Sequence, residues 1–96
     1  MTNEQLTRSL RSIGMACFVE YFPRFSDLNI SNEHLIQILM REQKYKESGC
    51  RTRVSQSRRI IANGRAKDAL LIVASSDRVS SDVSAAAGKL AHSLQR

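Results

Sequence analysis

Apolar residues recur every three or four positions along most of the chain, which is the spacing of one face of an α-helix. In the first segment they are Leu6, Leu10, Ile13, Cys17 and Tyr21, with Phe18 and Phe22 widening the stripe. This pattern predicts a helix over residues 3–22, with a capping box from Thr2 to Gln5 at its start and Pro23 at its end. Gly14 is the place where this helix can bend.

The same spacing predicts further helices at residues 32–43, 48–63, 65–75 and 81–95. Ser31, Ser48, and Ser80 or Ser81 stand at cap positions, and Asn63-Gly64 is a typical helix end. The run ALLIVA inside 65–75 also fits a buried strand, but no second strand stands out to pair with it, so helix is favoured. A chain of 96 residues is of single-domain size. We therefore expect an all-α fold, a compact single domain of about five helices covering residues 1–96.

Basic residues are concentrated in one segment of the chain. The net charge is +6, and residues 41–67 alone hold nine basic and two acidic side chains, a net of +7. The rest of the chain is nearly neutral. Such concentration favours a polyanionic partner, and a merely solvated helix is the alternative.

The predicted helix 48–63 carries much of this charge and has a narrow apolar side. The order of helix 32–43, a short polar connection and this basic helix resembles the layout of a helix-turn-helix. The connection QKYKE is longer than the usual three or four residues and has no glycine in its middle. In such a pair, the first helix braces the second, and the second enters the major groove of DNA.

Side chains of the basic helix suit nucleic acid, because Arg and Gln pair with base edges and Ser and Thr bond phosphate. The residues expected to read the groove are Arg51, Thr52, Ser55, Gln56 and Arg59. Those expected to hold phosphates are Arg53, Arg58, Arg65, Lys67, Lys44 and Lys46. Tyr45 fits either a backbone contact or a lid on the core, and Gly49 fits either close backbone approach or a tolerated small residue.

These patterns predict a small DNA-binding protein, a transcription regulator or accessory factor that acts on double-stranded DNA and forms a homodimer. The alternative is a protein-interaction module whose basic face docks an acidic protein partner. RNA binding is less favoured, because RNA readers stack bases on exposed aromatic residues and the basic segment offers only Tyr45.

Catalysis has little support in the sequence. His34 and His92 have no Cys, Asp or Glu at metal-ligand spacing, and no nucleophile elbow or Gly-rich phosphate loop is present. We expect no enzyme, no cofactor and no metal.

The two cysteines, Cys17 and Cys50, lie at apolar helical positions and are expected to be free thiols in a reduced, cytoplasmic protein, with a disulfide between them as the alternative. The apolar run IGMACFV is far shorter than the ~20 residues that span a bilayer, so no transmembrane segment is expected. Glu4 and Glu20 flank this run, so we expect no leader peptide either.

Overall fold

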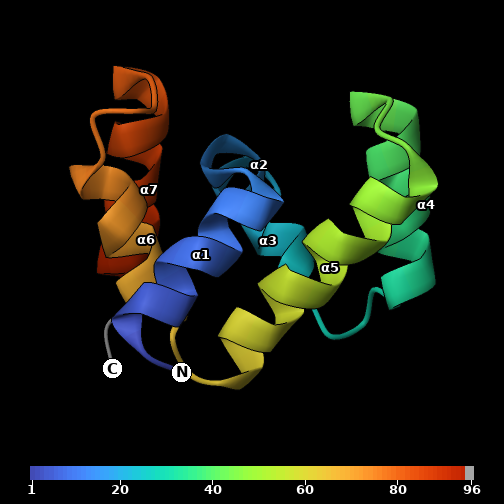
Figure 1. Cartoon of the computed structure of the whole chain (residues 1–96), viewed down its shortest axis with the longest axis horizontal. Helices are drawn as coiled ribbons and strands as arrows, with labels where there is room; N and C mark the ends of the chain where they lie inside the picture. Colours follow the sequence, from blue (N-terminus) through green and yellow to red (C-terminus); the bar gives the residue numbers. More distant parts are fainter. Residues whose placement is uncertain (95–96) are drawn as a thin grey trace.

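The computed structural model describes residues 1–94, which form helices and no strand (Figure 1). The all-α prediction is therefore confirmed. The helices are α1 (Asn3–Ile13), α2 (Met15–Glu20), α3 (Phe22–Phe25), α4 (Asn32–Gln43), α5 (Glu47–Ala62), α6 (Ala66–Ser75) and α7 (Ser81–Ser93).

The predicted first helix, 3–22, is in fact divided into α1, α2 and α3. Gly14 makes the first division, because its φ of 90° and ψ of 118° lie outside the helical region and suit only glycine. Its N–H still donates to Leu10 O, and its carbonyl accepts from Phe18, so α1 ends and α2 begins at the same residue. Pro23 does not end a helix, because it stands in the first turn of α3, where its missing N–H costs nothing.

Local signals placed most of the other helix ends correctly. Thr2, Ser31 and Ser80 cap α1, α4 and α7 through their side chains, as predicted. Ser48 is not a cap, because α5 begins at Glu47 and Lys46 is its N-cap. The segment ALLIVA is part of α6, which excludes the strand alternative. The predicted end of the last helix at residue 95 lies outside the described residues.

The end of α5 is a Schellman motif. The N–H of Gly64 donates to Ile61 O, and the N–H of Arg65 donates to Ile60 O, each at 3.0 Å. Gly64 has a φ of 71°, which this motif requires and which glycine adopts without strain. The motif turns the chain from α5 directly into α6.

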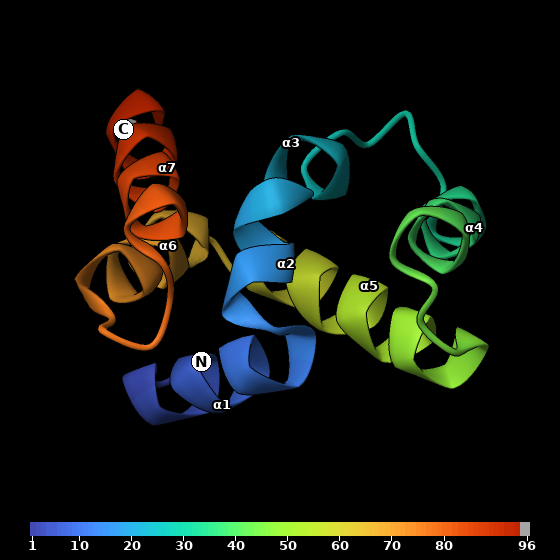
Figure 2. The ribbon, with the colours of Figure 1, turned by 90° about the horizontal axis from the view of Figure 1, so that it is seen from above.

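Helix α5 runs through the middle of the molecule, with α1 packed on one side and α4 on the other (Figures 1 and 2). Helices α6 and α7 pack together at the end opposite α4. The early aromatic residues lie in the core, as expected, with Phe18 between Phe22 and Phe25 at ring-centroid distances of 5.5 and 6.4 Å. Because α5 packs against both α1 and α4, only one side of this helix is exposed to solvent.

Candidate nucleic-acid interface

Helices α4 and α5 are joined by a connection of three residues, 44–46. This corrects the expectation of a longer connection and matches the length usual in a helix-turn-helix. Lys44 makes the turn possible, because it adopts the left-handed conformation, with φ of 57° and ψ of 29°. The two helices cross steeply in both views (Figures 1 and 2).

Arg51 ties the start of α5 to the start of α4. Its guanidinium lies 2.8 Å from Glu33 Oε1 and 2.7 Å from Glu47 Oε2. Hydrogen bonds from Glu33 and then Glu47 raise the pKa of Arg51 above its ordinary value. The side chain is exposed, but its positive charge is balanced by two carboxylates, so it contributes little to a cationic surface.

Glu42 fixes the other end of α4. Its carboxylate accepts hydrogen bonds from Tyr21 Oη at 3.0 Å and from Arg24 Nη1 at 3.2 Å. These two bonds, the one from Tyr21 foremost, lower the pKa of Glu42. Together with the Arg51 contacts, they link both ends of α4 to neighbouring helices, while its buried residues pack in the core.

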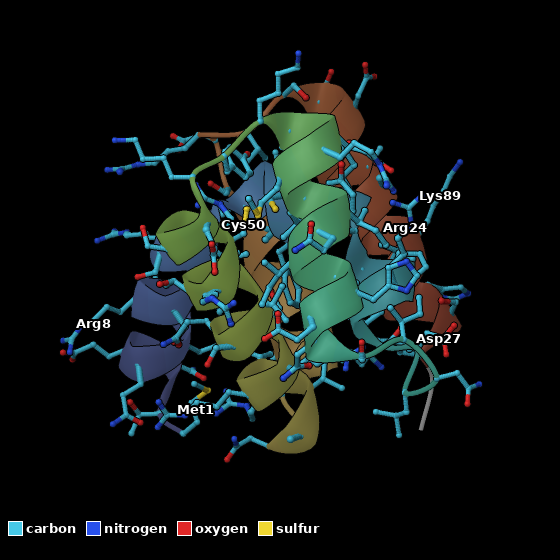
Figure 3. All side chains as sticks on the ribbon, turned by 90° about the vertical axis from the view of Figure 1, so that its right-hand side faces the viewer. Met1, Arg8, Arg24, Asp27, Cys50 and Lys89 are labelled. Carbon is cyan, nitrogen blue, oxygen red and sulfur yellow. The ribbon has the colours of Figure 1, made fainter. Side chains whose placement is uncertain are left out.

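Arg58 is bound inside the protein rather than free for phosphate. Its guanidinium donates to Phe25 O at 3.2 Å, to Asp27 O at 2.9 Å and to Asn32 Oδ1 at 2.9 Å. These acceptors belong to the end of α3, the following loop and the first residue of α4. The loop carries exposed side chains such as Asp27 on its outer side (Figure 3). Arg58 therefore fastens this loop to α5.

Arg65 has a similar part at the other end of α5. It donates to Asp68 Oδ2 at 2.7 Å and also bonds the carbonyl of Met1 and the side chain of Asn3. The start of α1 is thereby held against the start of α6. Only about a fifth of the Arg65 side chain is exposed, 21%.

Arg53 is stacked on Tyr45, with its guanidinium carbon 3.9 Å from the ring centroid. Such a contact between a cation and an aromatic face is favourable. Gly49 makes room for it, because a Cβ at that position would lie 2.8 Å from Arg53 Nη1. Tyr45 is half-buried and packs on the core, and a side chain at Gly49 would require Arg53 to shift.

A strip of α5 between α1 and α4 remains open, and we call Thr52, Ser55 and Arg59 the α5 ridge. All three side chains are exposed. The carbonyl of Arg59 accepts from Asn63, but its guanidinium makes no hydrogen bond or ion pair with any residue among 1–94. Thr52 Oγ1 donates to Ser48 O at 3.1 Å, which leaves its lone pairs available. The ridge is the part of the predicted reading face that the fold leaves unoccupied.

Gln56 is turned away from the ridge toward α1. It accepts a hydrogen bond from Ser9 Oγ at 2.9 Å. A shallow polar groove of about 250 Å³ runs here between α1 and α5, with Gln5, Arg8 and Ser12 on the α1 side and Arg59 on the α5 side. Arg8 projects from α1 into solvent (Figure 3).

The contribution of α1 to this surface was not predictable from the sequence. Arg8 and Arg59 are 51 positions apart, and nothing in the local pattern of either helix indicates that they share a groove. The remaining predicted cations, Lys44, Lys46 and Lys67, are exposed and form no ion pair within residues 1–94. The lysines stand before the start and beyond the end of α5.

No protein-family model, curated protein or solved structure matches the chain. Across residues 1–94, no group of three or more His, Cys, Asp and Glu side chains is arranged to hold a metal ion. In the same part of the chain, every helix is too short or too polar to cross a bilayer. Inferences about function therefore rest on the geometry and charge of the surface around α5.

Proposed function

We propose that this chain is a small DNA-binding protein in which α4 braces α5 and the α5 ridge enters the major groove. The observation that carries the proposal is the open ridge of Thr52, Ser55 and Arg59, which follows the three-residue connection from α4. A helix reaches base edges only where neighbouring helices do not cover it. The ridge meets this requirement on a helix that is otherwise packed on both sides.

The proposed contacts follow from which side chains are free. Arg59 is suited to the O6 and N7 atoms of guanine, and Thr52 and Ser55 to bases or phosphates. Lys44 and Lys46 would grip the backbone at one end of α5, and Lys67 at the other. Hydrogen bonds to phosphates fix register, whereas bonds to base edges carry the sequence preference.

The other arginines that were predicted to contact DNA instead contact groups within the protein. Arg58 and Arg65 bond main-chain carbonyls of distant segments, Arg51 bonds two carboxylates, and Arg53 stacks on Tyr45. We infer that these arginines hold α5 in place. Gln56 lines the groove beside the ridge and would reach DNA only by releasing Ser9.

A homodimer would present two copies of α5 to two half-sites and so double the contacts. We place the protein in the cytoplasm as a regulator or accessory factor. Cys17 and Cys50 are both buried free thiols, which suits a reducing compartment.

The test is fluorescence anisotropy of labelled random-sequence duplex DNA with the purified protein over a series of salt concentrations. Log K is expected to fall against log salt with a slope of about 0.9 per neutralised phosphate. On a duplex selected from the random pool, Arg59→Gln is expected to weaken binding by roughly 1–3 kcal/mol. Lys67→Gln is expected to weaken all duplexes alike and to lower the slope by about 1.

Lys89→Gln is the matched control, because Lys89 is an exposed cation on α7 and lies across the molecule from Arg8 (Figure 3). It is expected to leave DNA binding unchanged. Equal losses from Arg59→Gln and Lys89→Gln would show that only net charge matters and would reject the ridge. No binding to duplex at low salt, together with Arg59-dependent binding to polyglutamate, would replace the proposal with an acidic protein partner.

A further inference from the structure

A second hollow lies on the opposite side of α1 from the polar groove. It has a volume of about 770 Å³. Its walls come from α1, the start of α2, the α4–α5 connection, α6, and the loop that leads into α7. Segments far apart in the sequence meet here. The volume is within the roughly 300–1,000 Å³ that is usual for small-molecule sites.

The floor of this hollow is apolar. It is lined by Met15, Cys17, Tyr45, Ile72, Val79 and Val83. Cys17 is buried, and the others are half-buried although they pack against the core. Apolar surface that stays in contact with water is costly, and an apolar ligand group would remove it from water.

The rim of the hollow is cationic. Arg11 and Arg78 both line it, both are exposed, and neither side chain forms an ion pair or hydrogen bond within residues 1–94. Asp77 is the single carboxylate in the lining, so the lining has a net charge of +1. An anionic group is therefore favoured at the rim.

Two hydroxyl groups of the rim are oriented by the backbone. Ser76 Oγ accepts the N–H of Arg78 at 3.1 Å, and Ser80 Oγ accepts the N–H of Val83 at 3.2 Å. A hydroxyl that accepts in this way keeps its own proton to donate. Ser76 and Ser80 can thus add O–H donors to the two guanidinium groups.

We propose that this hollow binds an amphipathic organic monoanion, with its ring or alkyl chain on the floor and its anionic head between Arg11 and Arg78. The proposal does not depend on DNA binding, because none of the ridge residues lines the hollow. A bare inorganic anion would leave the floor in water, and a neutral apolar molecule would gain no charge-assisted hydrogen bond from the two guanidinium groups. The combination of floor and rim therefore selects a molecule with both parts.

The probe is anilinonaphthalene sulfonate, an aromatic monoanion whose fluorescence rises in apolar surroundings. A saturable rise at one dye per chain is expected, with dodecanoate displacing the dye and dodecanol displacing it far less well. In ¹⁵N-edited NMR spectra, the largest shifts are expected at Met15, Ile72 and Val83. Circular dichroism that is unchanged by the dye excludes binding to an unfolded form.

Arg11→Gln and Arg78→Gln are each expected to weaken dodecanoate binding about tenfold, since each removes a charge-assisted hydrogen bond. Lys89→Gln, which removes an exposed charge outside the hollow, is expected to have no effect. Ile72→Asn places a polar group on the floor and is expected to weaken dodecanoate binding. If this variant does not fold, the two arginine variants still test the proposal. Equal binding of dodecanoate and dodecanol, unchanged affinity in both arginine variants, or shifts centred on other residues would overturn the proposal.

Discussion

Replacing Arg58 with glutamine is expected to destabilise the protein strongly, whereas the same replacement at Arg59 is expected to leave its stability nearly unchanged. The two arginines are neighbours on α5 and carry the same charge. The Arg58 guanidinium donates to three acceptors on the α3–α4 segment at 3.2 Å or less, and to Arg24 O at the longer distance of 3.5 Å. The Arg59 guanidinium donates to none within residues 1–94. The pair therefore separates the effect of the contacts from the effect of charge and helix propensity.

The loss in free energy of unfolding can be worked out from the hydrogen bonds that glutamine cannot make. Glutamine is too short to span Phe25 O, Asp27 O and Asn32 Oδ1, so these hydrogen bonds are lost together. A hydrogen bond in a folded protein contributes about 1 kcal/mol net, which gives roughly 3 kcal/mol for the three. For a domain of this size that loss lowers Tm by about 12 °C, at about 4 °C per kcal/mol. A surface substitution such as Arg59→Gln stays within about 0.5 kcal/mol.

The assay is urea unfolding followed by circular dichroism for the wild type, Arg58→Gln, Arg58→Lys and Arg59→Gln. The lysine variant keeps the charge but lacks the planar fork of donors, so it is expected to recover only a minor part of the loss. The slope m should stay constant, which shows that the folded state itself has changed in stability. Equal stabilities of Arg58→Gln and Arg59→Gln, or full recovery by lysine, would refute the role assigned to the hydrogen bonds.

Three further predictions concern the turn, the stacked arginine and the thiols. Lys44→Gly is expected to raise stability by about 0.5–1 kcal/mol in thermal unfolding, because Lys44 is left-handed at the end of α4 and glycine adopts that conformation without strain; equal stability of Lys44→Gly and Lys44→Ala would contradict this. Alanine favours a helix over glycine by roughly 1 kcal/mol, but Gly49→Ala should raise the free energy of unfolding by much less, because the new Cβ displaces Arg53 from Tyr45. The full gain should appear when the same substitution is made in an Arg53→Ala background. Additive effects in this double-mutant cycle would count against the stacking. Burial raises the pKa of Cys17 to about 11, above its ordinary value of 9.0. Between these values the folded state keeps a proton that the unfolded state loses, so the free energy of unfolding should fall as pH rises from about 9 to 11. A Cys17→Ala variant with an equally steep fall would exclude this thiol as the cause.

Much of the fold was predictable because its signals are local. A helix and its caps depend on residues within about four positions of one another, and such patterns are complete in the sequence. The capping box at Thr2, the caps at Ser31 and Ser80, and the stop at Asn63-Gly64 were all placed correctly. The division of the first helix was less visible, since its apolar stripe continues through Gly14 without interruption.

The sequence by itself determined the all-helical class, most of the helix ends and the concentration of positive charge in residues 41–67. Only the tertiary structure decided which of those charges are free. Arg58 and Arg59 look alike in the sequence, but the carbonyls that hold Arg58 come from a segment about 30 positions earlier, and Arg59 faces the open groove beside α1. Hydrogen-bond partners, unlike helix periodicity, depend on how distant segments pack, and this is why the residues proposed to meet DNA are fewer than the basic residues of the segment.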